Sequence, residues 1–507
     1  MRPGVFQRCI LPKRLKLLTR SFGAQAAEST RLTFAISSTT SKSKLIDLVR
    51  EHTTEKRGDI AIRSGNELGY GATVLASREF TSWLDDANFM SSLIGAVLGP
   101  RNKFENIDVL SGVVDGLGPQ KRSSLGEPLS GFSILHGPTA NILPGLWDPV
   151  SFDTTRHSQD TASSISFITN PLEGDTRPLE ITLPLANTIF QNGRRSTLYA
   201  SKWQNSQDGY TTTSSRNQKI AQSMSANGPA IKHASPKIPL IPLAPPRKIV
   251  AGLGNIVRQV EVDGNATPAS KELEDLIPKV FESRLKQYRI SSQGPIGVWC
   301  WVIPSHVIES MNLRDLHVFE PGSSQAELTL AMNSLGVFSR LLSTGCRLHK
   351  ILSGGGGWGL KQGLLSLDPE RTFSLPDQDD VDMFIRAFEE RNSNSPSEGL
   401  VTPGSYLLFC IEPHWTDEEL SSSDDLTSSA TLSLGVAPNA DEDQVPTPVQ
   451  GAEAPKVLVG HFGATSRTGL YLRTIPEVST LTGKDLDSRA SHSFTTKIDV
   501  PRASISL

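Results

Sequence analysis

Residues 294–304 read GPIGVWCWVIP, an apolar run with a Gly-Pro pair before it and a proline after it. A short apolar run bounded in this way predicts a strand buried in the protein core. Cys300 lies in the middle of the run, where cysteine usually serves as a small buried hydrophobe. We therefore expect a core strand here, in the second half of a chain of 507 residues.

Helical patterns lie on both sides of this strand. Before it, residues 267–288 read TPASKELEDLIPKVFESRLKQY, which predicts a helix with Thr267 as its cap and Pro268 in its first turn. After it, Ser324 and Glu327 have the S-x-x-E spacing of a capping box, and Gly345 is a natural stop. Apolar residues at helical spacing lie between these signals, namely Leu328, Ala331, Leu335, Phe338 and Leu342.

The remaining patterns divide the chain into two lobes. Strand and helix patterns alternate over 31–204, which predicts an N-terminal α/β lobe. Residues 205–246 are polar and then proline-rich and are expected to be a linker. Residues 247–507 form the expected C-terminal α/β lobe. Within it, 416–455 has no Lys or Arg and predicts a disordered acidic insertion. The expected fold is α/β or α+β, with two packed mixed-sheet lobes and long irregular loops.

The N-terminus has the composition of a mitochondrial transit peptide. Residues 1–22 are basic, contain no acid and interleave their charges with apolar residues. The positive charges are Arg2, Arg8, Lys13, Arg14, Lys16 and Arg20. Removal of this leader takes the formal net charge from −3 to −9, which does not favour a general nucleic-acid binder. We expect a protein of the mitochondrial matrix; a basic nucleic-acid arm or a simple tail is the alternative interpretation of the leader.

Several functional classes find no support in the sequence. No window of about 18 apolar residues predicts a transmembrane helix. The four cysteines, Cys9, Cys300, Cys346 and Cys410, are scattered without CxxC spacing, so no metal site is expected. The chain has no G-x-S-x-G or H-E-x-x-H motif, and the pattern does not favour an enzyme. No cofactor can be assigned.

The stretch ILSGGGGWGLKQGLLSLDPE, at 351–370, is the first candidate ligand site. Its candidate residues are Gly354, Gly355, Gly356, Gly357, Trp358, Lys361 and Gln362. A Walker A loop needs lysine where Leu360 stands, and a lone glycine pattern inside a polyglycine run does not establish a dinucleotide site. The favoured interpretation is a structural corner in which Trp358 packs as an anchor; a loop that binds a small molecule or a partner is the alternative.

Two further glycine turns carry polar side chains. AGLGNIVRQ, at 251–259, presents Asn255 and Arg258 and is interpreted first as a turn into regular structure. LPLANTIFQNGRRSTL, at 183–198, brings Asn187, Arg194 and Arg195 near one turn. Two adjacent arginines can hold a carboxylate or phosphate through paired hydrogen bonds, although solvated turn residues are the more common case.

These stretches carry a resemblance to known families. Together LPLANTIFQNGRRSTL, PPRKIVAGLGNIVRQ and ILSGGGGWGLKQGLLSLDP resemble the signature stretches of a functionally uncharacterised family of fungal mitochondrial proteins, over about 180–370, with TKIDVP at 496–501 as a fourth block. The front segment, with DIAIRS, ATVLAS and VLSGVVDG, is similar to FIST-type sensory domains, which implies small-ligand sensing.

The sequence thus predicts a soluble mitochondrial protein with a binding or assembly role, in organelle gene expression as one possibility. Its partner would be a mitochondrial protein complex or a small molecule. The alternative is a FIST-like ligand sensor, or an enzyme with a site between the lobes at the glycine-rich stretch. A pocket with converging polar groups at that stretch would favour the alternative, and a buried tryptophan corner the first reading.

The leader can be tested by deletion. Removal of residues 1–22 from a C-terminal fluorescent fusion should abolish mitochondrial localisation, because it removes every basic residue that precedes the first acid, Glu28. Fluorescence microscopy measures the outcome, and residues 1–22 placed before an unrelated reporter should carry it into mitochondria. Import of the deleted chain would contradict the prediction.

Overall fold

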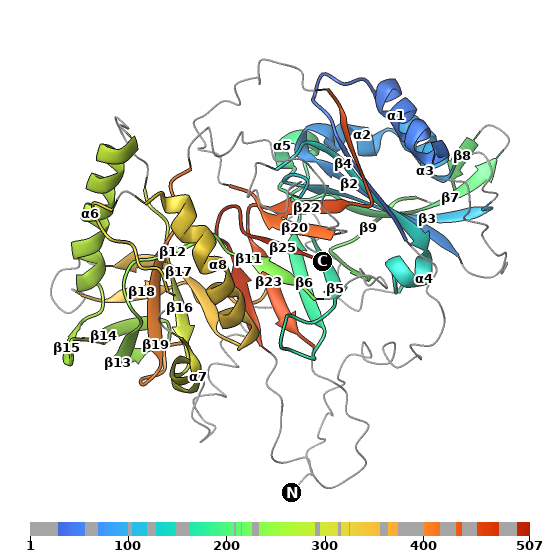
Figure 1. The fold of residues 1–507 in the computed structure, drawn as a ribbon. Helices are drawn as coiled ribbons and strands as arrows, with labels where there is room; N and C mark the ends of the chain where they lie inside the picture. Colours follow the sequence, from blue (N-terminus) through green and yellow to red (C-terminus); the bar gives the residue numbers. More distant parts are fainter. Residues whose placement is uncertain are drawn as a thin grey trace, which may run out of the picture.

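The computed structural model describes most of the chain between Ser29 and Leu507. The described residues are 29–55, 69–99, 104–118, 128–148, 162–206, 209–213, 215–225, 233–288, 295–312, 316–323, 325–354, 363–373, 400–415, 432–438, 454–475 and 494–507. Within them the strands form four sheets. Figure 1 shows a helix-covered sheet, a central layer of strands and a second lobe on the far side of that layer.

The first sheet has eight strands in the order β21-β1-β4-β2-β3-β7-β8, with β9 paired to β7. Their bounds are β1 Thr30–Ala35, β2 Tyr70–Ser77, β3 Asn106–Val114, β4 Gly131–Pro138, β7 Leu198–Ser206, β8 Gly209–Thr212, β9 Asn217–Gln218 and β21 Lys456–Val459. Only β2 and β3 pair in parallel; the other neighbours are antiparallel. This is a mixed sheet, as the alternating front pattern predicts.

Three helices cover one face of this sheet. They are α1 Lys42–Glu55, α2 Thr81–Asp85 and α3 Ala87–Leu98. Helix α3 begins after Asp86, whose side chain accepts hydrogen bonds from the N–H groups of Asn88 and Phe89. Its apolar residues pack with those of α1 onto inward-facing residues such as Phe34 and Phe132. These helices alternate with strands, as the pattern over 31–204 predicts.

A second layer of strands packs against the opposite face. One sheet has the order β10-β5-β6-β23-β24 and the other β11-β25-β20-β22. Their bounds are β5 Ser164–Thr169, β6 Leu179–Pro184, β10 Ala221–Ser225, β11 Ser235–Lys237, β20 Leu432–Val436, β22 Phe462–Ser466, β23 Leu470–Thr474, β24 Thr495–Ile498 and β25 Ser504–Ser506. Two short helices lie in the connections of this half, α4 Thr139–Ile142 and α5 Ile189–Asn192.

The second lobe is a closed ring of six antiparallel strands. The ring runs β19-β13-β14-β18-β17-β16 and closes where β16 pairs with β19. Strand β12 pairs with β19 beside β13, and β15 pairs with β14 beside β18, so both extend the wall of the ring. The bounds are β12 Ile241–Pro242, β13 Arg247–Leu253, β14 Ile256–Val262, β15 Asn265–Pro268, β16 Val298–Ile303, β17 Arg347–Gly354, β18 Leu365–Leu367 and β19 Tyr406–Ile411. Closure leaves this small sheet without exposed long edges.

Strand β16 contains the VWCWVI run and is buried on both faces. Cys300 points into the core of the ring, whereas Trp299 and Trp301 belong to the core that the ring shares with the central strands. The neighbouring strand β19 alternates in the same way, with Phe409 toward the ring interior and Leu408 toward the shared core. This explains why the run is continuously apolar, and it confirms the predicted core strand.

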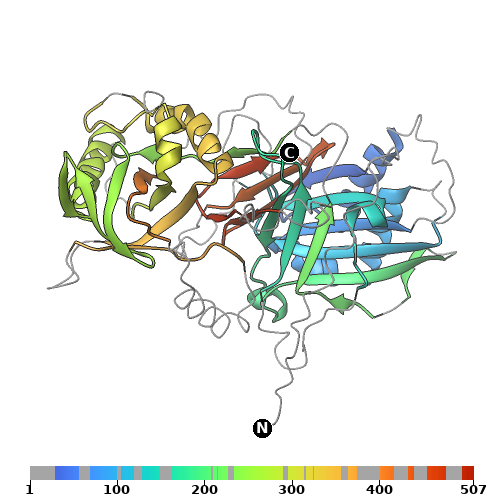
Figure 2. The same ribbon diagram turned by 90° about the horizontal axis from the view of Figure 1, so that it is seen from below.

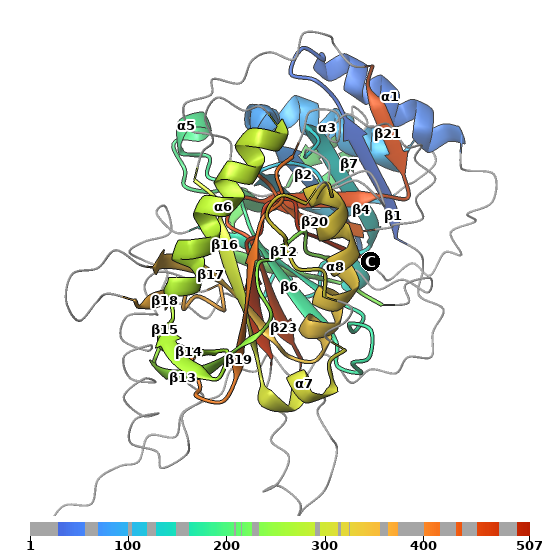
Figure 3. The same ribbon diagram turned by 60° about the vertical axis from the view of Figure 1, so that its left-hand side comes forward.

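Helices α6 Lys271–Tyr288 and α8 Glu327–Ser343 flank the ring, as Figure 3 shows, and α7 Ser305–Ser310 follows β16. The predicted start of α6 is wrong, because Thr267 and Pro268 belong to β15 and pair with β14. The expected role of Glu327 is also wrong. It is the first residue of α8, where the structure gives no side-chain cap, and Ser324 lies outside the described residues.

Glu327 instead forms a buried ion pair. Its carboxylate accepts hydrogen bonds from Arg284 of α6 at 2.8–3.2 Å, and the two side chains are 2% and 3% exposed. The Arg284 guanidinium also donates to the carbonyl of Glu412, and the N–H of His414 donates to Glu327. Two helices and the end of β19 are thereby joined by charge-assisted hydrogen bonds.

Helix α8 ends as the sequence predicts. Gly345 has φ of +84°, its N–H donates to the carbonyl of Leu342, and the N–H of Cys346 donates to that of Leu341. This is the Schellman arrangement, in which glycine relieves the strain of the left-handed conformation. The buried face of the helix includes Ala331, Phe338 and Leu342 as expected.

The path of the chain differs from the expected linker and insertion. Within 205–246 the described residues include β10, which pairs with β5, and β12, which pairs with β19, so this segment is part of the sheets. Within 416–455, residues 432–436 form the buried strand β20. The short strands in both segments are stabilised by partners that are distant in sequence, and a polar or acidic composition around them does not show this pairing.

The C-terminal strands return to the front of the molecule. Strand β21 pairs with β1 and β23 pairs with β6, so residues beyond 455 complete sheets that begin before 204. Figure 2 shows the red strands of the C-terminal end of the chain between the ring and the helix-covered sheet, whereas β21 is an edge strand of the helix-covered sheet itself. The predicted fold class of packed mixed-sheet lobes is confirmed. The lobes, however, share strands in a way that the linear division does not express.

The buried ion pair gives a stability prediction. Glu327→Ala should lower the free energy of unfolding by about 3–5 kcal/mol, because it leaves Arg284 buried without its counter-charge. Urea titration measures this change. Asp47→Ala is the matched control, since Asp47 and Arg50 are 73% and 61% exposed and such pairs contribute about 0–1 kcal/mol. Equal effects of the two substitutions would contradict the assignment.

Candidate functional site

The glycine-rich stretch joins two antiparallel strands. Gly354 ends β17 and pairs with Leu365 of β18. A Cβ at Gly354 would lie 2.4 Å from the Leu365 side chain, and one at Gly363, where φ is +80°, would lie 2.5 Å from Pro268. Glycine is therefore required at Gly363 by its positive φ and by the rigid proline ring, whereas a side chain at Gly354 would displace the end of Leu365. Gly355, Gly356, Gly357, Trp358, Lys361 and Gln362 lie outside the described residues.

The surroundings of this stretch do not match a phosphate loop. The described chain enters it from β17 and leaves it into β18. A Walker A loop leads into a helix, whose N-terminal N–H groups face the phosphates. The described residues on either side thus favour the structural corner over the phosphate cradle.

A network of charged side chains lies where this hairpin meets the central strands. Lys497 of β24 donates to Asp368 and Glu370, which follow β18, at 3.1 and 2.6 Å. The hydroxyl of Tyr471 donates to Glu370 at 2.8 Å, and the indole N–H of Trp299 donates to Asp499 at 2.7 Å. Each bond crosses from the ring to the central layer, so the network orients the two lobes.

His349 of β17 is buried beside this network. Its Nδ1 lies 2.8 Å from the carbonyl oxygen of Asp368 and must donate to it, while Nε2 has no partner in the described structure. The ring is 3% exposed. Burial lowers the pKa of His349 to about 4, because a second proton would place a charge where solvent cannot reach it. This histidine is thus a neutral structural residue.

The turn at 251–259 is a tight hairpin. Strands β13 and β14 are joined through Gly254, which has φ of +61°, and Asn255. The side chain of Asn255 donates to the carbonyl of Leu367 at 2.9 Å, and Leu367 returns a bond from its N–H to the carbonyl of Asn255. Arg258 is exposed on β14. This geometry supports the structural interpretation of Asn255.

The turn at 187–195 is a rigid loop held by hydrogen bonds of its own. The Thr188 hydroxyl donates to the carbonyl of Arg194 at 2.9 Å and lies 2.9 Å from the Thr197 hydroxyl. The Asn192 side-chain amide donates to the Thr197 hydroxyl at 2.9 Å. The Asn187 side-chain oxygen accepts from the backbone N–H of Ile189 at 3.0 Å. Because these bonds are internal, the shape of the loop does not depend on a ligand.

The loop presents apolar side chains to solvent. Phe190 is 96% exposed and Ile189 is 48% exposed. Among the described large hydrophobic residues Phe190 is the most exposed, ahead of Leu253 at 77%. A rigid turn that projects an aromatic ring in this way is a preformed anchor for an interaction. The sequence identified the polar residues of this turn but not Phe190. A single aromatic residue in a loop does not show whether its side chain is exposed or buried.

The two arginines of the loop differ in their surroundings. The Arg194 guanidinium donates to the Gln218 side chain at 3.1 Å and lies 5.2 Å from the centroid of the Tyr199 ring. Arg195 is exposed beside it on the same turn. The structure therefore brings Asn187, Arg194 and Arg195 onto one loop, and places Asn255 and Arg258 on a separate hairpin of the ring.

Comparison with known proteins does not assign this chain. No family model matches it, and no match is found among curated proteins or solved structures. Within the residues that the structure describes, no helix is long and apolar enough to cross a membrane. In the same residues, no group of three His, Cys, Asp or Glu side chains could hold a metal ion.

Buried His349 predicts a pH dependence of stability. The unfolded imidazole binds a proton near its ordinary pKa of 6.5 and the folded one near 4, so the unfolded state holds more protons between these values. Stability should fall as pH drops through this window, by about 3 kcal/mol in total.

Urea titrations between pH 7 and pH 4 measure this change. His349→Asn should flatten the dependence, whereas substitution of the exposed His306 should leave it unchanged. An identical pH profile in His349→Asn would contradict the prediction.

Proposed function

We propose that this chain is a mitochondrial protein that binds a protein partner through the turn at 187–195. The observation that supports the proposal is Phe190, an aromatic side chain 96% exposed on a loop that its own hydrogen bonds hold rigid. Burial of such a side chain in a partner contributes about 1.5–3 kcal/mol. Because the loop is already ordered, little conformational entropy is lost on binding.

The chemistry of the turn defines the partner surface. Phe190 and Ile189 require an apolar pocket, and exposed Arg195 beside them favours a rim of carboxylates around that pocket. This agrees with the binding or assembly role expected from the sequence. The basic composition of residues 1–22 supports an encounter in the matrix, where the complexes of organelle gene expression are the first candidates to test.

The alternative of a small-ligand or catalytic site at the glycine-rich stretch has weaker support. Its defining residues, 355–362, lie outside the described structure. The described residues beside them, Gly354 and Gly363, are explained by close packing.

The proposal is tested by cross-linking from the loop. A photoreactive phenylalanine analogue at position 190 should capture a defined protein in mitochondria of the source organism, identified by mass spectrometry. The same analogue at position 253 is the control, since Leu253 is 77% exposed on the distant hairpin of the ring. Capture from both positions, or from neither, would overturn the proposal.

Affinity for the captured partner provides the quantitative prediction. Phe190→Ala should weaken binding about 30-fold or more, the size of a 2 kcal/mol anchor residue, without change in thermal stability. Leu253→Ala should leave the affinity unchanged. Co-sedimentation with vesicles of anionic lipid that depends on Phe190, without a captured protein, would replace the protein partner by a membrane surface.

A further inference from the structure

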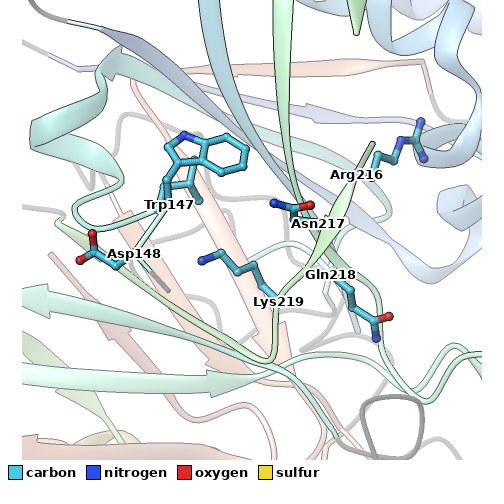
Figure 4. A pocket seen from close by; sticks show the side chains of 7 residues that line it. Trp147, Asp148, Arg216, Asn217, Gln218 and Lys219 are labelled. Carbon is cyan, nitrogen blue, oxygen red and sulfur yellow. The ribbon is translucent and has the colours of Figure 1, made fainter. Parts of the chain in front are cut away.

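A cavity of about 370 Å³ lies between the turn after α4 and strand β9. It is lined by Leu146, Trp147, Asp148, Arg216, Asn217, Gln218 and Lys219. Figure 4 shows Lys219 extending from the strand side toward the turn that carries Trp147 and Asp148. This volume is at the lower end of those of small-molecule sites.

Alternation along residues 216–219 directs their side chains to opposite sides. Arg216 reaches Asp85 of α2 at 3.2 Å, and the Gln218 side chain accepts from Arg194 at 3.1 Å. Asn217 and Lys219 therefore point the other way, into the cavity, as Figure 4 shows. Of the four residues that 216–219 contribute to the lining, Asn217 and Lys219 are those whose side chains extend toward the turn that carries Trp147.

Lys219 is a buried cation without a bonded counter-ion. Its residue is 7% exposed, and its backbone is fixed by bonds to the carbonyl of Leu198 and from the hydroxyl of Ser163. Within the described part of the chain its ammonium makes no ion pair. Burial lowers the pKa of Lys219, and attraction to Asp148 opposes this only partly. A group in this position is stabilised by an anion that enters the cavity.

Trp147 forms an oriented aromatic wall of the cavity. Its indole N–H donates to Asp108 at 2.9 Å, and the Lys202 ammonium lies 4.8 Å from its ring centroid. These contacts hold the ring from its edge and from one face. Exposed Asp148 stands beside it, where its negative charge opposes entry of anions with more than one charge.

We propose that this cavity binds a small organic monocarboxylate with a planar apolar group, its carboxylate on Lys219 and its planar group against Trp147. Ammonium and carboxylate form a charge-assisted hydrogen bond, and the apolar face of Trp147 adds contact area beside it. The site is independent of the turn at 187–195 in function, so failure of either proposal leaves the other standing.

Isothermal titration of the full chain with benzoate tests the proposal, with inorganic phosphate as the comparison anion. Benzoate should bind with a dissociation constant in the millimolar range or tighter, and phosphate should bind at least tenfold more weakly. Lys219→Met should weaken benzoate binding at least tenfold. Lys248→Met, at an exposed lysine of β13 in the ring, is the matched control and should change it less than threefold.

Two further measurements keep the test independent of folding defects in Lys219→Met. Asp148→Asn, at an exposed position, should strengthen benzoate binding by removing a negative charge. In the unaltered chain, affinity should fall as pH rises through the lowered pKa of Lys219, because the neutral amine no longer attracts a carboxylate. Absence of benzoate binding, equal affinity for phosphate, or an unchanged affinity in Asp148→Asn and across pH would overturn the proposal.

Discussion

The architecture depends on two strands that are buried on both faces. In β16 and β19 alternate residues fill the ring interior, while the residues between them fill the core shared with the central layer. Strands β16 and β19 therefore form both the wall of the ring and the boundary between the two lobes. A one-residue slip of either strand would exchange the two sets and move Trp299 and Trp301 into a ring sized for Cys300. The register of these strands fixes how the lobes meet.

The polar contacts at the boundary follow from this arrangement. Lys497, Asp368, Glu370 and Asp499 gather at the margin of the shared core, where they are hydrogen-bonded to one another or to aromatic side chains. Burial alone would lower the pKa of Lys497, but its bond to Glu370 and the nearby carboxylates raise it instead. A permanently charged lysine at this margin gives directional contacts to an interface that is otherwise apolar and non-directional.

The sequence predicted an element correctly where the residue pattern within that element agrees with how its side chains are buried in the structure. The helix at 87–98, the glycine stop at Gly345 and the core strand around Cys300 each carry signals within a few residues. Sequence patterns gave wrong predictions for side chains whose partners lie far away in the chain. Glu327 has capping-box spacing, yet its carboxylate accepts hydrogen bonds from Arg284, 43 residues earlier. No sequence motif marks Lys219 as a site residue. Its own segment has an ordinary polar composition, and the turn that completes the pocket lies some 70 residues earlier in the chain. The turn at 187–195 was predicted in part. The sequence identified its polar residues as a candidate site but did not identify the exposed Phe190.

The pairing of β1 with β21 has a consequence for the time at which the molecule can assemble. Leu32 is opposite Val459, so the first described strand obtains one of its neighbours only after nine-tenths of the chain has been synthesised. Contacts of such sequence separation form slowly, since a long loop must close before they stabilise anything. The first sheet of a nascent chain therefore remains incomplete until β21 has been synthesised. Under the import into mitochondria that we propose, this delayed completion would keep the precursor competent for translocation.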